Sequence, residues 1–242
     1  AGSGRSSADI IAIGAMAGLI ISILDRTGLG QALTLLLASV GEDSIILLLL
    51  LTAVVSILLG MGMPTSAIYL LLATMIAPSL VKLGIHPISA HMFVLYFGLM
   101  SMITPPVAIA AFAAATLSGA KPMATGVTAV RLGWIAYVVP FVFVLSPALL
   151  WQGSTFAIAT GAITAFVGVW LGSSGLIGFM FGPQSSAGRA ILFVAGILLL
   201  IPGDAIENGL LINGAGLALG LAWAAKDYLA NQKVNSEVSI KE

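Results

Sequence analysis

The feature that most constrains the fold is a run without any charged residue, from Ser44 to Val81. As one straight helix at ~1.5 Å per residue this run is about 57 Å long, nearly twice the hydrocarbon thickness of a membrane. The run therefore has to fold back or break. Its middle carries two glycines and a proline in "GMGMPTS", Gly60 to Ser66. The limbs on either side are about 24 Å (Ser44 to Leu59) and about 21 Å (Ala67 to Leu80) long if helical, so we predict a re-entrant helical hairpin.

Composition places the whole chain in a membrane. Hydrophobic residues make up 60% of it and charged residues 7%, whereas soluble domains carry roughly a quarter charged residues. Apolar segments of helix length recur along the chain, which predicts an all-α, polytopic helical membrane protein and excludes a barrel of short alternating strands. The formal net charge of zero argues against a nucleic-acid partner, and the absence of cysteine removes disulfides and thiol chemistry.

A second uncharged stretch, Met92 to Ala120, is about 43 Å long if helical and is interrupted by "SMITPPVA". Pro105 and Pro106 remove two backbone donors, and Pro105 also moves Thr104 away from helical backbone angles. We therefore expect a discontinuous helix, with one half before Ser101 and the other after Val107.

These features divide the chain into five parts. We expect a linker, a scaffold helix and an amphipathic arm in residues 1–43, and part of a transport domain in residues 44–123, with the re-entrant hairpin at 44–81 and the broken helix at 88–118. A transmembrane helix kinked at Pro140 follows at 124–150, then C-terminal transmembrane helices of structural duty at 151–226 and a polar, solvated cytoplasmic tail at 227–242. With the tail in the cytoplasm, only Arg26 and Lys82 fall on the outer side, as the positive-inside rule requires. The Gly/Ser-rich opening "AGSGRSSADI" is typical of an interior linker, so we expect a fragment of a longer polypeptide.

The two interruptions point to one binding site. Irregular backbone at membrane depth is tolerated only where it is buried in protein or lines a wet cavity. Carbonyls at helix ends suit a small hard cation such as sodium, and free amides at half-helix starts suit a carboxylate. Hydroxyls lie beside each interruption, on Thr65 and Ser66 at the first and on Ser101 and Thr104 at the second.

The residues around both interruptions also carry a family resemblance. The segments "LGMGMPTSAIYLLLATMIAPSLVKLGIHPISAHMFVLYFGLMSMITPPVAIAAFAAATLSGAKPM" and "RLGWIAYVVPFVFVLSPALL" resemble the C-terminal half of the fused permease of tripartite ATP-independent periplasmic (TRAP) transporters, in the TAXI subclass. The similarity runs from about Ile10 to Leu150, and more loosely through "LLLIPGDAIENGLLI".

The resemblance implies a sodium-driven importer of small organic acids, which works as an elevator in the bacterial inner membrane. It implies inverted repeats, of which this chain holds only the second, so the first half of the permease and a periplasmic substrate-binding protein are expected partners besides the lipid bilayer. Sodium is the expected coupling ion, with no organic cofactor and no transition metal. The implied sodium-binding residues are Gly60, Gly62, Met63, Pro64, Thr65, Ser101, Met102, Thr104 and Pro105; the implied substrate-binding residues are Thr65, Ser66, Thr104 and Pro106.

Other interpretations remain open or are weaker. The chain is alternatively a non-transporting membrane scaffold subunit, or a sodium and carboxylate symporter that needs no binding protein. His86 and His91 lack the spacing and the companion ligands of a metal site. No pairing of nucleophile, base and carboxylate supports an enzyme. The substrate stays open among dicarboxylates, amino acids and aromatic acids.

Overall fold

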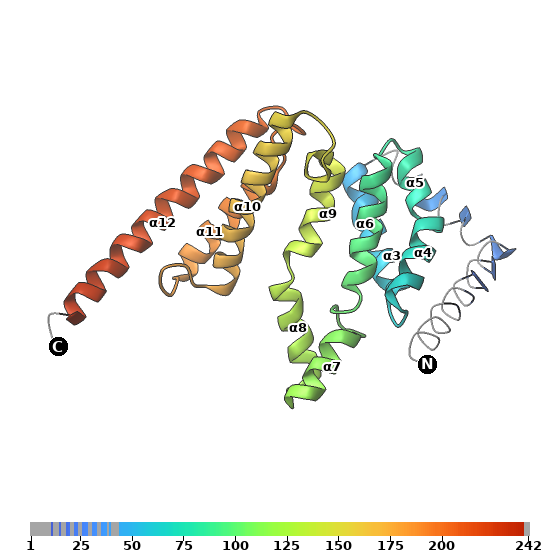
Figure 1. Ribbon diagram of the computed structural model, residues 1–242, viewed down its shortest axis with the longest axis horizontal. Coiled ribbons are helices and arrows are strands. Elements are labelled where there is room, and N and C mark those ends of the chain that lie inside the picture. The colour runs from blue at the N-terminus through green and yellow to red at the C-terminus, as the bar shows by residue number, and fades with distance from the viewer. Residues whose placement is uncertain are drawn as a thin grey trace. The chain divides into compact units, whose positions relative to one another are not determined.

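The computed structural model describes residues 44–239 continuously and scattered residues between 11 and 39. Our expectations for the linker, scaffold helix and amphipathic arm of residues 1–43 lie outside the described residues. Within the described part every regular element is a helix (Figure 1), which confirms the all-α class. Four helical segments there are long and apolar enough to cross a membrane, namely Thr65–Lys82, Pro122–Leu145, Thr155–Ile177 and Gly209–Leu229. The chain divides into two compact units, residues 1–144 and 145–242.

The first unit begins with the hairpin. Helix α3 (Ile45–Gly60) starts at Ser44, whose side chain accepts a hydrogen bond from the Leu47 amide. It ends at Gly60, because Met61 has extended backbone angles and Gly62 has a φ of +83° that favours glycine. Pro64, which has no amide to leave unpaired, precedes α4 (Thr65–Met75). The apolar run thus turns back at "GMGMPTS".

The returning limb is itself divided. Helix α5 (Ala77–Lys82) follows α4 after Ile76. Pro78 at the start of α5 cannot donate to the preceding turn. The Pro78 nitrogen therefore leaves the Thr74 carbonyl without its i→i−4 donor.

The discontinuous helix consists of α6 (Pro87–Met100) and α7 (Ile109–Ser118). A series of turns joins the two halves, and Ala108 before α7 has a left-handed φ of 37°. The Ala110 amide donates to the Met102 carbonyl at 3.0 Å, which ties the first turn of α7 back to this connection. We refer to residues 101–108 as the α6–α7 break.

The next span is interrupted where we did not expect it. Helix α8 (Pro122–Leu132) and α9 (Ile135–Leu145) meet at Gly133 and Trp134, whereas Pro140 lies inside α9. The sequence did not predict the interruption at Gly133, and the kink expected at Pro140 stays a prediction. Helix α9 packs on α6 through Phe141, which stacks edge to face with Phe93 and Phe97.

The core of this unit lies between α6 and the hairpin. α6 contacts α3, α4 and α5 (Figure 1). The fully buried side chains of this core include those of Leu48, Ile68, Leu72 and Phe93. The outer faces of the same helices expose large apolar side chains such as Ile46, as expected of surfaces that meet lipid tails.

The second unit holds a short 3-10 turn, η1 (Pro147–Leu150), and three longer helices, α10 (Thr155–Ile177), α11 (Ser186–Leu200) and α12 (Gly209–Ser239). α11 packs against both α10 and α12. α12 continues as helix to Ser239, through most of the segment that we expected to be a solvated tail. Five of the eight residues of "KDYLANQK" have good helix propensity, namely Lys226, Leu229, Ala230, Gln232 and Lys233, and they allow this extension.

Candidate functional site

The hairpin tip contacts the start of the α6–α7 break. A Cβ atom built on Gly60 would lie 2.7 Å from the Gly98 carbonyl oxygen and 2.8 Å from Ser101 Oγ. Real Cβ atoms essentially never come closer than 3.0 Å to another heavy atom. Glycine at position 60 therefore permits a backbone approach that any other residue would prevent. The structure therefore brings Gly60, at the start of the first interruption, into contact with Ser101, at the start of the second.

Two hydroxyls of the break are held by main-chain carbonyls. Ser101 is buried, and its hydroxyl donates to the Gly98 carbonyl at 2.6 Å. Thr104 Oγ1 donates to the Met100 carbonyl at 2.5 Å and lies 2.8 Å from the hydroxyl of Tyr137 in α9. Because the Thr104 hydrogen is directed to the Met100 carbonyl, the Tyr137 hydroxyl donates to Thr104 Oγ1, which leaves one Thr104 lone pair, and the Ser101 lone pairs, to accept or to bind a cation.

Helix α8 and the start of α9 hold the break from another side. A Cβ atom on Gly126 would lie 2.9 Å from Pro105 Cγ, and one on Gly133 would lie 3.1 Å from Ile103 Cδ1. Two glycines therefore let this span pack closely on the non-helical segment. Tyr137 is placed one turn beyond Gly133, where its hydroxyl reaches Thr104.

The helix termini at this site carry complementary partial charges. α3 ends at Gly60 and α6 ends at Met100, so the negative ends of two helix dipoles meet where Gly60 contacts Ser101. The first turns of α4 and α7 have no side-chain cap. The arrangement therefore offers carbonyl oxygens to a cation, and main-chain amides at the beginning of α4 to an anionic group.

The remaining candidate residues lie outside the contact between Gly60 and Ser101. Met63 packs against the apolar core, and Met102 and Pro105 are partly buried. Gly62, Pro64, Thr65 and Ser66 of the first interruption are exposed, and so is Pro106 of the second. Within the described part of the chain, no hydrogen bond joins Pro106 to any of the other four.

Two buried hydroxyls on α3 were not predicted from the sequence. Thr52 and Ser56 are both fully buried, and neither hydroxyl has a hydrogen-bond partner among the described residues. They lie four residues apart on the face of α3 that also carries Gly60. The signal that reveals them is this spacing of Thr52, Ser56 and Gly60 at i, i+4 and i+8. An unpaired buried hydroxyl costs about 1–3 kcal/mol, which makes this stripe unusual for a purely structural face.

A helical membrane protein in which a hairpin tip meets the break of a discontinuous helix has the architecture of secondary transporters. Residues 1–158 match the family model described as "Tripartite ATP-independent periplasmic transporter, DctM component". The chain belongs to this family, and it is a multi-pass membrane permease component of TRAP transporters. Neither the curated proteins nor the solved structures that were compared with the chain give a match.

The matched residues include all of the first unit and reach only the start of α10. Membership of a transporter family agrees with the expectation that the chain is not an enzyme. The looser resemblance that we saw in "LLLIPGDAIENGLLI" lies beyond the match.

Proposed function

We propose that the chain is the second half of a TAXI-type TRAP permease, which imports small organic acids into the bacterial cell in symport with sodium. In this proposal the first unit carries the moving part of an elevator, and sodium binds between the hairpin tip and the α6–α7 break. The first half of the permease, fused upstream or separate, supplies the other repeat. A periplasmic binding protein delivers the substrate.

One observation carries this proposal: the contact of Gly60 with Gly98 and Ser101. It joins the carboxyl ends of α3 and α6, whose carbonyl oxygens carry the negative ends of two helix dipoles and are ligands of the kind that sodium prefers. The carbonyls of Gly98, Leu99 and Met100 at the end of α6 also accept main-chain hydrogen bonds. The hydroxyls of Ser101 and Thr104 supply further oxygens. The site contains no charged side chain, so the ion is held by dipoles and can be released on the inner side.

The substrate class follows from the other helix ends. The uncapped first turn of α4 places main-chain amides beside Thr65 and Ser66, and free amides at a helix start attract carboxylates. A carboxylate there lies near the proposed sodium ion, which couples the binding of one to the binding of the other. We keep dicarboxylates, amino acids and aromatic acids as candidates, because the groups named here bind a carboxylate and do not distinguish among these acids.

The test is sodium-dependent uptake by the complete permease with its binding protein in proteoliposomes. Thr104→Ala removes an oxygen within the α6–α7 break, and Pro64→Ala relaxes the backbone constraint before the start of α4. Both variants should need more sodium for half-maximal uptake, about tenfold for Thr104→Ala. The matched control is Thr116→Ala, whose hydroxyl also donates to a carbonyl of its own helix, that of Phe112 in α7, outside the break.

Unchanged sodium dependence in both variants would refute the site. Uptake that persists without a binding protein would favour the symporter alternative, and absence of uptake by a folded, complete assembly would favour a scaffold.

A further inference from the structure

The second unit contains a polar pocket in the region that we had assigned to structural duty. It lies where α12 packs against residues 178–185, the connection between α10 and α11. Its volume is about 210 Å³, whereas a single buried water needs roughly 10–15 Å³ on this measure. The connection contributes Pro183, Gln184 and Ser185 to the lining, and α12 contributes Trp223, Lys226 and Asp227. The pocket therefore has room for a polar group of several heavy atoms.

Trp223 forms a fixed wall of the pocket. Atoms of its indole ring lie 2.6 and 2.8 Å from the position that a Cβ atom on Gly188 would take, so the ring packs directly on the backbone of the first turn of α11. Its Nε1 donates to Gln184 Oε1 at 2.9 Å, and Gln184 Nε2 donates to the Gly182 carbonyl at 3.0 Å. These contacts hold both side chains in place, so the wall is formed before any ligand binds.

Lys226 supplies a positive charge. Its Nζ lies 4.4 Å from the ring centre of Trp223, so the ammonium group is held over the wall of the pocket. Asp227 follows it in the chain, but the Oδ2 atom of Asp227 accepts a hydrogen bond from the Phe181 amide at 3.1 Å. No ion pair joins Lys226 to a carboxylate within the described part of the chain. In this part of the chain the ammonium group is therefore available to an anionic group of a ligand.

Ser185 adds a neutral donor to the same pocket. Its hydroxyl oxygen accepts a hydrogen bond from the Gly188 amide at 3.2 Å. Among the described residues the hydroxyl hydrogen finds no acceptor, so this group can donate to a ligand. An ammonium group and a hydroxyl that line one pocket suit the oxygens of a phosphate.

The carboxylate of Asp227 lines the pocket as well. A carboxylate has about four lone-pair positions, and the Phe181 amide takes one of them. It therefore accepts further donors, and a cationic donor forms the strongest hydrogen bonds with it. A simple anion would be repelled by this carboxylate, whereas a ligand that carries both a phosphate and an ammonium group complements Lys226 and Asp227 together.

The pocket lies at the boundary of the predicted membrane-spanning segments. Two helical segments suited to cross a membrane, Thr155–Ile177 and Gly209–Leu229, end beside its lining residues. Phe181 in the connection packs edge to face against Trp170 and Tyr228, with ring centres 6.5 and 5.4 Å apart. Tryptophan and tyrosine gather where lipid tails meet water. Both segments also expose large apolar side chains, so a phospholipid headgroup at this depth has surfaces for its acyl chains beside it.

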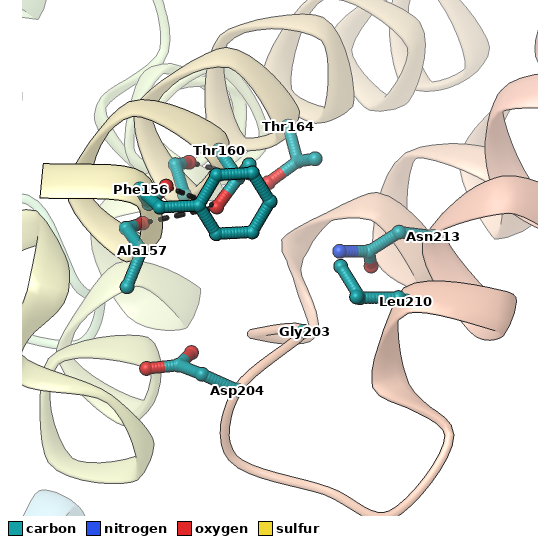
Figure 2. Close-up of a pocket in the computed structure, with 9 residues that line it drawn as sticks. Phe156, Ala157, Thr160, Thr164, Gly203, Asp204, Leu210 and Asn213 are labelled. Carbon is teal, nitrogen blue, oxygen red and sulfur yellow. Dashed lines mark hydrogen bonds between the residues drawn. The ribbon is translucent and has the colours of Figure 1, made fainter. Parts of the chain in front are cut away.

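The opposite end of the unit has a different lining. The pocket there, about 100 Å³ in volume, is lined in part by Phe156, Thr160 and Asp204 (Figure 2). The Asp204 carboxylate accepts a hydrogen bond from the Ser146 hydroxyl at 2.7 Å. None of the described residues that line this pocket is basic. Because basic residues favour the cytoplasmic side, the pocket that contains Lys226 is directed to the cytoplasmic leaflet.

From these charges and this position we propose that the pocket at Trp223 and Lys226 binds the headgroup of a phospholipid with a primary amine, such as phosphatidylethanolamine. The phosphate binds Lys226 and Ser185, and the ammonium group binds Asp227. The acyl chains lie along the exposed apolar side chains of α10 and α12. The site lies outside residues 1–158 and uses neither the hairpin tip nor the α6–α7 break, so it does not depend on the proposed function.

The experiment measures the binding of phosphatidylethanolamine, labelled with a fluorophore on one acyl chain, to the purified full chain in a non-ionic detergent. Unlabelled phosphatidylethanolamine should displace the probe. Phosphatidylcholine should need a concentration about five- to tenfold higher, because its quaternary ammonium group cannot donate a hydrogen bond to Asp227. Free phosphoethanolamine should not displace the probe at these concentrations, because it has no acyl chains. This comparison uses the unaltered chain and needs no variant.

Two variants test the two charges. Lys226→Gln removes the positive charge, and we expect the affinity for phosphatidylethanolamine to fall about tenfold, whereas Lys226→Arg should retain most of it. Asp227→Asn keeps an oxygen for the Phe181 amide and should abolish the preference over phosphatidylcholine. Lys121→Gln is the matched control, since it makes the same charge change at an exposed lysine that does not line the pocket. It should bind the probe as the unaltered chain does.

Three results would overturn the proposal. The first is equal displacement of the probe by phosphatidylethanolamine and phosphatidylcholine, and the second is an unchanged affinity in a folded Lys226→Gln variant. The third is displacement by free phosphoethanolamine as strong as that by the lipid, because the site would then bind a soluble phosphate ester. Thermal unfolding without added lipid shows whether each variant is folded. If Lys226→Gln is not, the comparison of lipids on the unaltered chain and on Asp227→Asn decides.

Discussion

The contact between the hairpin tip and the α6–α7 break can be tested with a single methyl group. In Gly60→Ala the new Cβ would lie 2.7 Å from the Gly98 carbonyl oxygen and 2.8 Å from Ser101 Oγ. Ordinary contacts of a Cβ atom begin at 3.4 Å, so the tip and the break have to separate by about 0.7 Å. The Gly98 oxygen belongs to the backbone of α6 and cannot turn aside as the end of a side chain can.

Gly60→Ala should change both the stability of the protein and the sodium concentration that it needs for uptake. Overpacking costs about 1–3 kcal/mol, and alanine in place of glycine at a helical position returns up to about 1 kcal/mol. The net loss is therefore roughly 0–3 kcal/mol, which lowers the melting temperature by up to about ten degrees. Metal sites, in contrast, tolerate ligand displacements of only about 0.2 Å. We expect the sodium concentration for half-maximal uptake to rise about ten- to a hundredfold.

The assay is sodium-dependent uptake by the complete permease and its binding protein, together with thermal unfolding of the same preparations. Gly214→Ala is the matched control, because a Cβ atom on Gly214 meets nothing within 4 Å and the change should leave both quantities unaltered. If Gly60→Ala is folded and transports with the original sodium dependence, the close approach of tip and break is not required for sodium binding.

Two further predictions concern the second unit. Gly196→Ala would place a Cβ atom 2.5 Å from the Gly172 amide nitrogen and 2.6 Å from the Gly168 carbonyl oxygen, so we expect a loss of about 3 kcal/mol in thermal or denaturant unfolding. Gly161→Ala, where the nearest contact is 3.8 Å, should lose nothing, and equal melting temperatures for both variants would contradict the close packing of α10 on α11. Arg189→Met removes two donors to carbonyls at the end of α10 and should cost about 1 kcal/mol in the same measurement, because the guanidinium is exposed to solvent. A stability equal to that of the unaltered chain would show that these hydrogen bonds are replaced by water.

The positions of both main interruptions could be predicted because they depend on local covalent structure. Proline lacks an amide hydrogen, and glycine adopts a positive φ without strain, so the sequence alone marks where a helix stops. The structure ends α6 at Met100 and begins α7 at Ile109, next to the limits of Ser101 and Val107 that the sequence suggested.

The same local rule does not locate the interruption between α8 and α9, because Pro140 lies inside α9. Whether a proline bends a membrane helix depends on what else satisfies the freed carbonyl and on the packing around it. Here the helix is interrupted at Gly133 instead, where a side chain would press on Ile103 in the break. That contact joins residues far apart in the chain, so no local pattern reveals it.

The sequence by itself therefore determined the class of the protein, a polytopic helical membrane protein, and the two segments where its helices break, whereas the TRAP permease family was recognised by similarity of its motifs to known members. Hydrophobicity, helix length and the backbone preferences of glycine and proline are properties of short segments, and these settle such questions. Only the tertiary structure decided that Gly60 meets Ser101, that Thr52 and Ser56 lie unpaired on the same face of α3, and that Asp204 and Asn213 line one pocket with two threonines of α10. These relations depend on how helices pack against one another, because packing brings together oxygens that are distant in the chain and leaves them without competing partners.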